Sequence, residues 1–297
     1  MIEFQHVYKF LGKKQVLQDV NLTIPDGSVF GLIGENGAGK STLLRLLSGI
    51  YQCDGGKLLL DGERIYDNRS CKQQILFISD DPFQFFHSTL ADMKRFYQDW
   101  YDIDEALYYR YLKLFQLDEH KPLHNFSKGM KRQAFILLGL AAAPRYLLLD
   151  EAFDGLDPIM RRHFKQIIAD QIADKKMSVI ISSHDLKELQ DFCDSFAMLE
   201  NGTIHTSGLM NEALSDIHHI QMAFLNEVNP EWFQELDIIT MQINSRVVKL
   251  YVKGDEARIR TYLESLKPLV LELLPVQLEE MFIQEVIHNK EAVHHEL

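Results

Sequence analysis

The segment Gly-Glu-Asn-Gly-Ala-Gly-Lys-Ser-Thr at residues 34–42 decides the fold, because it stands between a strand pattern and a helix pattern. Residues 29–33 form a short apolar run and residues 43–48 are apolar at helical spacing, so the order is strand, glycine loop, helix. The glycines allow backbone dihedrals that side chains disfavour, so that loop N–H groups can surround a phosphate. We therefore predict a nucleotide site made of Gly34, Asn36, Gly37, Ala38, Gly39, Lys40, Ser41 and Thr42.

Two side chains of this loop have individual predicted tasks. Lys40 reaches the terminal phosphates of the nucleotide, and the Ser41 hydroxyl takes a Mg²⁺ position. The first helix adds its positive N-terminal end to the same site.

Strand and helix patterns alternate after this loop. Apolar runs at residues 74–79, 146–149 and 179–181 predict buried strands, and helices are expected at residues 127–143, 158–172 and 184–192. Residues 2–7, 16–24 and 57–60 predict further strands near the N-terminus. This order predicts an α/β fold with a parallel, doubly wound sheet whose ligand lies at the carboxyl edge.

Polar side chains stand where two of these strands end. Asp150 and Glu151 follow the apolar run 146–149, and His184 follows the strand at 179–181. Asp150 is placed to hold the metal through water, and Glu151 to orient a water for in-line attack on the γ-phosphate. A neutral His184 imidazole is placed to touch the same phosphate. Glu151 and His184 are thus the predicted catalytic residues.

The sequence Phe-Ser-Lys-Gly-Met-Lys at residues 126–131 lies at a predicted helix N-terminus and resembles the signature motif of ATP-binding-cassette (ABC) proteins, usually L-S-G-G-Q. With the glycine loop, Asp150, Glu151, the loop at 155–157 and His184 in the family's order, the resemblance covers about residues 2–208. It implies a P-loop NTPase core with an antiparallel β subdomain and a helical subdomain at about 82–143, and ATP and Mg²⁺ as cofactors. It further implies a head-to-tail dimer, in which Ser127 and Gly129 of one subunit close over ATP held by the other. Asp157 is added to the nucleotide site by the same resemblance. A helix N-terminus with free N–H groups favours such an anion.

Several positions depart from the family pattern. Lys128 replaces the first signature glycine, and Asp80 or Asp81 stands where the family has a glutamine that binds Mg²⁺. The predicted metal ligands are therefore Ser41, Asp150 and Asp80. The aromatic ring that stacks on adenine in the family falls near residue 11, where this chain has Leu11 with Phe10 and Tyr8 close by.

Residues 209–297 predict a separate, small α+β domain. Strands are expected at 220–225, 238–243 and 247–252, and helices at 255–266 and 277–287. This segment has 15 acidic and 7 basic residues, a net charge of −8 out of −12 for the whole chain. Since nucleic acid and anionic lipid would repel it, we expect a protein partner and no nucleic acid.

An aromatic-rich segment is the expected partner site. Residues 83–115 contain 11 of the 31 aromatic side chains. In the family that the chain resembles, this region docks a coupling helix of a membrane permease, which makes residues 83–101 the predicted groove.

The resemblance is strongest to ATPases of bacterial exporters with a separate permease, in the peptide and antibiotic-resistance branch. It implies a homodimer, or a heterodimer with a second ABC ATPase, located in the cytoplasm and peripheral on the inner face of the cell membrane. The lack of an 18-residue apolar run, of a secretory signal and of paired cysteines agrees with that location.

Three alternatives remain open. An importer ATPase has the same motifs. A soluble ABC protein acting on ribosomes or DNA usually has two cassettes or a long coiled-coil insertion, whereas only 87 positions separate Lys40 from Ser127. A GTPase or small-molecule kinase is disfavoured because the N-K-x-D guanine-reading motif is missing; Asn-Lys-Glu-Ala at 289–292 does not fit it.

Overall fold

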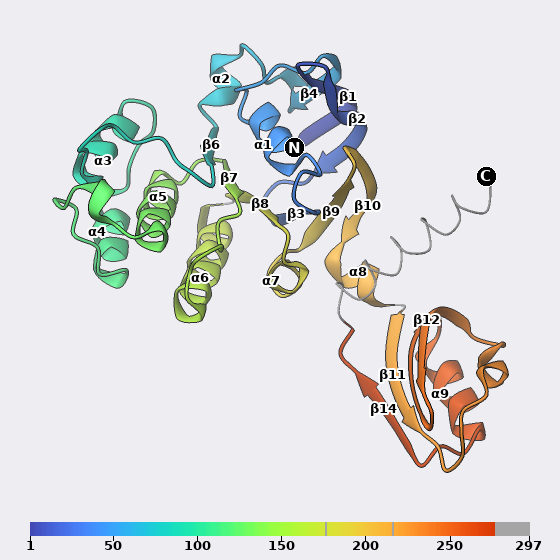
Figure 1. Ribbon diagram of the computed structural model, residues 1–297. Coiled ribbons are helices and arrows are strands. Elements are labelled where there is room, and N and C mark those ends of the chain that lie inside the picture. The colour runs from blue at the N-terminus through green and yellow to red at the C-terminus, as the bar shows by residue number, and fades with distance from the viewer. Residues whose placement is uncertain (176, 216, 277–297) are drawn as a thin grey trace. The chain divides into compact units, whose positions relative to one another are not determined.

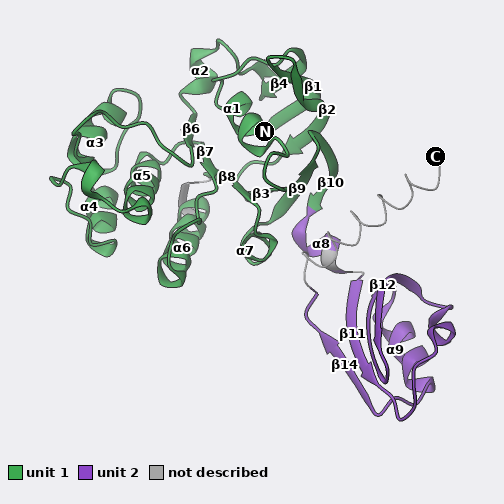
Figure 2. Cartoon of the chain, in the orientation of Figure 1, with its two compact units in different colours: residues 1–208 green, residues 209–297 purple. Residues whose placement is uncertain are grey.

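The computed structural model describes residues 1–175, 177–215 and 217–276. The chain forms two compact units, Met1–Gly208 and Leu209–Leu297 (Figure 2).

A six-stranded sheet is the centre of unit 1 (Figure 1). Its strand order is β10-β9-β3-β8-β7-β6, and every pair from β9 to β6 is parallel. The strands are β3 (Val29–Ile33), β6 (Ile75–Ile78), β7 (Tyr146–Asp150), β8 (Ser178–Ser183), β9 (Ser195–Glu200) and β10 (Thr203–Leu209). All residues of β3, β7 and β8 are buried, as expected for parallel strands covered on both faces. The predicted α/β fold is confirmed.

A second, antiparallel sheet holds the phosphate loop from the other side. It has the order β2-β1-β4-β5, formed by β1 (Ile2–Leu11), β2 (Lys14–Ile24), β4 (Gly55–Leu60) and β5 (Glu63–Arg64). Helix α1 (Lys40–Leu47) contacts β2 of this sheet and also β6 and β7 of the parallel sheet. Leu43, Leu44, Leu46 and Leu47 on α1 are fully buried in the core that joins the two sheets. The helix that follows the phosphate loop is therefore fixed by both sheets.

The remaining helices of unit 1 lie beside the sheets. They are α2 (Arg69–Lys72), α3 (Leu90–Gln98), α4 (Glu105–Leu114), the short helix η1 (Leu123–Asn125), α5 (Lys128–Ala142), α6 (Pro158–Lys175) and α7 (Leu186–Gln190). Helix α5 contacts both α3 and α4, and the three form a lobe at the left of Figure 1. None of the helices in the described ranges is both long and apolar enough to cross a membrane.

Two helices begin later than the sequence suggests. The helical subdomain is expected from about residue 82, but its first helix, α3, begins at Leu90 because Thr89 and Asp92 form a capping box there. The predicted helix at 184–192 is shorter, since Asp185 rather than His184 is the N-cap of α7 and accepts hydrogen bonds from the N–H groups of Lys187 and Glu188.

Unit 2 is a four-stranded antiparallel sheet with one main helix. The order is β12-β13-β11-β14, formed by β11 (Ile217–Ala223), β12 (Asp237–Asn244), β13 (Val247–Lys253) and β14 (Val270–Leu274). The helices are α8 (Met210–Ser215), η2 (Pro230–Phe233) and α9 (Glu256–Ser265), and α9 buries Ile259 and Leu263 against Met222 and Leu250 of the sheet. Strand β14 was not predicted. The predicted helix at 277–287 lies outside the described residues.

Asp26 lies in a cluster of charges in unit 1 that gives a pH-dependent prediction. Burial alone would raise the pKa of this carboxyl, but hydrogen bonds from the Met1 amine, the Tyr146 hydroxyl and the Arg145 guanidinium outweigh burial and lower the pKa to about 2. A carboxyl with a lowered pKa stabilises the fold above the pKa of the unfolded chain, 3.8, and this stabilisation is lost as the pH falls toward 2.

We therefore expect Asp26→Asn to lower the free energy of unfolding by about 1 kcal/mol at pH 7, a value reduced for partial solvent exposure. The difference from the parent should shrink as the pH falls from 4 to 2. Urea unfolding at several pH values measures it, with Asp102→Asn at an exposed site as the control. An equal difference at all pH values would show that Asp26 is not the titrating group.

Candidate nucleotide site

The loop before α1 has the backbone of an anion site. Gly37 and Gly39 have φ values of +87° and +116°, which side chains disfavour, and Gly39 is the N-cap of α1 without a side-chain cap. The first N–H groups of α1 are thus left for a ligand. Gly34 differs from the prediction, because its φ is not positive. It is required by close packing instead, since a Cβ at this position would lie 2.3 Å from the carbonyl oxygen of Leu199.

The side chain of Lys40 is held inside the loop and is only 5% exposed. Its Nζ donates to the carbonyl oxygens of Gly34, at 2.6 Å, and of Glu35, at 3.2 Å. Glu151 Oε1 lies 3.3 Å from the same Nζ. The ammonium therefore lies at the wall of the pocket beside the loop. There a phosphate would replace the Glu151 carboxylate as its anionic partner.

Asp150 and Glu151 are positioned by β8. Ser182 on β8 donates from its hydroxyl to Asp150 Oδ1 at 2.7 Å and accepts from the Glu151 N–H at 3.0 Å. Asp150 is buried, whereas Glu151 turns its carboxylate to His184, with 2.9 Å between Oε2 and Nδ1. Glu151 has a φ of +49°, in the left-handed region that a glutamate rarely adopts. This backbone turns Glu151 away from the strand direction, so that it contacts both Lys40 and His184.

Lys40, Asp150 and Glu151 line one pocket of about 430 Å³. Its lining contains most of the predicted loop and acidic residues, together with residues of β1 and β2: Leu11, Lys14, Val16, Glu35, Asn36, Gly37, Gly39, Lys40, Ser41, Thr42, Asp80, Asp150 and Glu151. Leu11 and Val16 give one wall an aliphatic surface, where the family that the chain resembles has an aromatic ring.

The oxygen donors of Ser41 and Asp150 fit Mg²⁺, which prefers hydroxyl, carboxylate and phosphate oxygens. Within the described residues no group of three or more His, Cys, Asp or Glu side chains is arranged to hold a metal by itself. Ser41 and Asp150 would therefore hold Mg²⁺ together with phosphate oxygens of the nucleotide.

Six predicted residues, all in the described part of the chain, lie outside this pocket's lining: Gly34, Ala38, His184, Ser127, Gly129 and Asp157. Gly34 and Ala38 belong to the phosphate loop itself, and His184 contacts the site through Glu151. Ser127 is exposed, and its Oγ accepts the N–H of Met130 as the cap of α5. Asp157 Oδ1 caps α6 by accepting the N–H groups of Ile159 and Met160, each at 3.0 Å. Within their own chain, Ser127 and Asp157 therefore serve as helix caps.

The sequence did not indicate Arg132 as a site residue. Its side chain is 4% exposed and donates to the carboxylate and the carbonyl of Asp80 and to the carbonyl of Asp154. Arg132 was missed because the pairing depends on the loop at 80–82 lying against α5, which the spacing of residues does not reveal.

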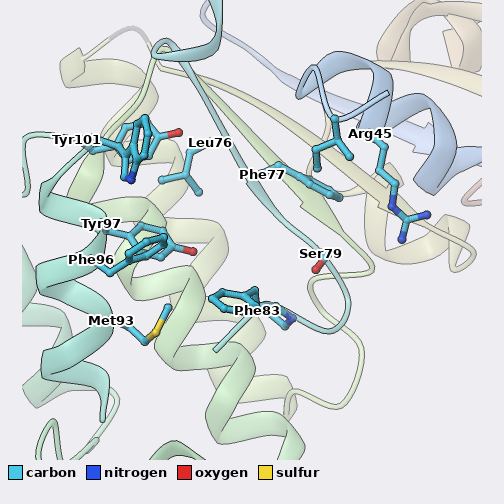
Figure 3. A pocket seen from close by; sticks show the side chains of 12 residues that line it. Arg45, Leu76, Phe77, Ser79, Phe83, Met93, Phe96, Tyr97 and Tyr101 are labelled. Atoms are coloured by element: carbon cyan, nitrogen blue, oxygen red, sulfur yellow. The ribbon is translucent and has the colours of Figure 1, made fainter. Parts of the chain in front are cut away.

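A hollow lies between the end of α1, strand β6 and helix α3 (Figure 3). It has a volume of about 330 Å³, with Arg45 on one side and Met93, Phe96, Tyr97 and Tyr101 on the other. A second hollow of about 460 Å³ shares Ile50, Phe77, Trp100 and Tyr101 with it and adds Asp67, Arg69 and Lys72 near α2. We call the two together the α1–α3 groove.

Comparisons with known proteins agree with these features. The sequence profile of the family described as ABC transporter matches residues 17–154. The ABC transporter ATP-binding protein YtrB of Bacillus subtilis (strain 168) is 34% identical over 286 residues, which cover 95% of this chain and 97% of YtrB. The lantibiotic transport ATP-binding protein SrtF of Streptococcus pyogenes is 29% identical over 230 residues, with 77% of this chain and 97% of SrtF covered. The methionine import ATP-binding protein MetN 2 of Pseudomonas syringae pv. tomato (strain ATCC BAA-871 / DC3000) is 30% identical over 282 residues, with 86% and 81% covered. The solved structure of an ATP-binding subunit of an ABC transporter superposes with a TM-score of 0.66 at 29% identity, over 71% of this chain and 91% of that one.

Proposed function

Because this chain belongs to the ABC transporter family and is an ATP-hydrolysing, ATP-binding subunit of such a transporter, we propose that it drives a separate membrane permease of the exporter type through closure of a head-to-tail dimer. This proposal rests mainly on one observation: Lys40, Asp150 and Glu151 line one pocket, whereas Ser127 and Gly129 are not part of its lining. A second subunit, either another copy or a related ABC ATPase, supplies the signature residues that complete this pocket.

In this proposal each side chain has one task. Lys40 binds the terminal phosphates, Ser41 and Asp150 hold Mg²⁺, and Mg²⁺ when bound neutralises charge on the phosphates. Glu151 accepts a proton from the attacking water, while His184, 2.9 Å from Glu151 Oε2, holds that carboxylate in place. Leu11 and Val16 provide an aliphatic surface for the adenine base. Asp157 at the start of α6 lies on the side that meets the second subunit.

The exporter direction rests on the altered signature motif, on the acidic pair Asp80–Asp81 and on similarity to a lantibiotic transport protein. An importer is the alternative, since a methionine import protein is also similar. Co-expression with the permease that co-purifies with this chain, followed by transport in inside-out vesicles, tests the direction. ATP-dependent accumulation of the cargo inside inside-out vesicles supports export, and its loss from preloaded vesicles supports import.

We further propose that the α1–α3 groove receives the permease. Its α3 side is aromatic and open, with Phe83 65% and Trp100 56% exposed. The opposite side has three cations, Arg45, Arg69 and Lys72, against the single carboxylate of Asp67, in a chain of net charge −12. An amphipathic helix fits this groove if it places its apolar side on α3 and acidic side chains toward α1 and α2.

Phe83→Asp is therefore expected to abolish co-purification with the permease, because it places a desolvated charge in the apolar part of the contact. ATP binding and the Tm of the isolated subunit should remain at the parental values, since Phe83 is largely exposed. The measurement is recovery of the detergent-solubilised complex, with Leu225→Asp at an exposed apolar site of unit 2 as the control. Full recovery with Phe83→Asp would place the permease elsewhere.

A further inference from the structure

Asp80 lies where the nucleotide pocket meets the signature helix. Its side chain lines the pocket together with Asp150 and Glu151. Its Oδ1 accepts a hydrogen bond from Arg132 Nη2, and Lys128 Nζ is 3.6 Å from the same oxygen. Both cations belong to the first turns of α5, which Ser127 caps. The carboxylate of Asp80 is thus paired with the helix that carries the signature motif.

Arg132 extends this connection to a third segment. Its Nη1 donates to the carbonyl of Asp154, and its Nη2 also donates to the carbonyl of Asp80 at 3.2 Å. The loop after Asp154 packs directly on the signature motif, since a Cβ on Gly129 would lie 2.9 Å from the carbonyl oxygen of Gly155. One buried guanidinium therefore joins the loop of Asp80, the start of α5 and the loop 154–157.

We propose that Asp80 is a positioning residue, which acts through Arg132 to hold Ser127, Gly129 and the loop 154–157 in place, and that it is not a ligand of Mg²⁺. Two cations beside a carboxylate repel a divalent cation from it. Asp150, by contrast, accepts its hydrogen bond from the neutral Ser182 hydroxyl rather than from a cation. This assignment replaces the metal role that the family resemblance predicts for Asp80. It rests on the proposed function only in assigning Ser127 and Gly129 to the ATP of a second subunit.

The arrangement links two faces of unit 1. The wall of the chain's own nucleotide pocket is fixed, through Asp80 and Arg132, to the segments that would meet the second subunit's ATP. A shift of Asp80 when the pocket fills would therefore move those segments with it.

Hydrogen exchange of the nucleotide-free protein tests the positioning role without metal or turnover. The variants are Asp80→Asn and Arg132→Gln, singly and together, with Asp81→Asn as the matched control because it removes the same charge one residue away. We expect amides in peptides 130–135 and 154–157 to exchange about 10-fold faster or more in both single variants, because a hydrogen bond to a charged group is lost. The double variant should exchange no faster than the faster single variant, since the two residues act through one another. Parental exchange in Asp80→Asn would overturn the proposal.

The Mg²⁺ concentration for half-maximal binding of a fluorescent ATP analogue tests the metal part, in a Glu151→Gln background that prevents turnover. Asp80→Asn should leave this concentration within about 2-fold of the background value, whereas Asp150→Asn should raise it about 10-fold or more. An equal rise in both would make Asp80 a metal ligand and overturn the proposal.

Arg132→Lys is a second variant for the hydrogen-exchange test if Arg132→Gln fails to fold, and it should restore part of the parental exchange. Failure of the background protein to dimerise with ATP would contradict the proposed dimer, yet both readouts would still decide the role of Asp80.

Discussion

Glu151→Gln is expected to lower ATP turnover by about 10²–10⁴-fold, because it removes the group that we propose accepts a proton from the attacking water. The amide has the shape of the carboxylate, so the backbone hydrogen bonds from the Glu151 N–H to Ser182 remain. ATP binding should be retained or strengthened, since Lys40 no longer has the Glu151 carboxylate 3.3 Å from its Nζ as a competing anion. The variant should therefore accumulate as an ATP-bound dimer. Phosphate release at saturating ATP and sedimentation with and without ATP measure the two effects.

Glu227→Gln is the control for this variant, as the same chemical change at an exposed position of unit 2. Its turnover should equal that of the parent. Parental turnover in Glu151→Gln would mean that another group activates the water, and His184 would then be the first residue to test.

Lys40→Ala should weaken ATP binding by about 10- to 100-fold, because a charge-assisted hydrogen bond to phosphate contributes about 1.5–3 kcal/mol. The loss has a second cause, since the variant leaves the Glu151 carboxylate facing the phosphates without its cation. We therefore expect Lys40→Ala/Glu151→Gln to bind ATP more tightly than Lys40→Ala alone. Titration with a fluorescent ATP analogue at fixed Mg²⁺ measures this difference.

Lys40→Met is the control for packing, because it keeps the apolar part of the buried side chain while removing the charge. It should bind ATP as weakly as Lys40→Ala. Adenosine, which lacks phosphates, should bind all variants equally. If Lys40→Met bound ATP like the parent, the loss in Lys40→Ala would come from loop packing rather than from charge.

The residues that the sequence predicts well are those whose positions follow from local pattern. The glycine loop stands between a strand and a helix in both sequence and structure, and Asp150 and Glu151 end β7 beside it, so one parallel sheet brings them together. Ser127 and Asp157 cap the helices that their residue types suggest. Such features need only dihedral preferences and periodicity, which a single sequence contains.

What the sequence could not predict depends on contacts between distant segments. The pairing of Arg132 with Asp80 joins residues 52 positions apart, and no spacing rule connects them. The sequence suggested that Gly34 is needed for its backbone dihedrals. The structure shows instead that a side chain at this position would collide with the carbonyl oxygen of Leu199 on β9. Strand β14 has only five residues and pairs with β11, which is 47 or more positions earlier, so its short apolar run did not distinguish it from a loop.

The left-handed backbone of Glu151 has a consequence for laboratory evolution. Glycine would relieve this conformation, by ~1 kcal/mol, but glycine has no carboxylate. Glycine would also remove the contacts of the carboxylate with Lys40 and His184 and, in the proposed mechanism, the catalytic base. A screen for heat-resistant variants must therefore require turnover at every round. At this residue, the backbone preference and the proposed catalytic role oppose each other.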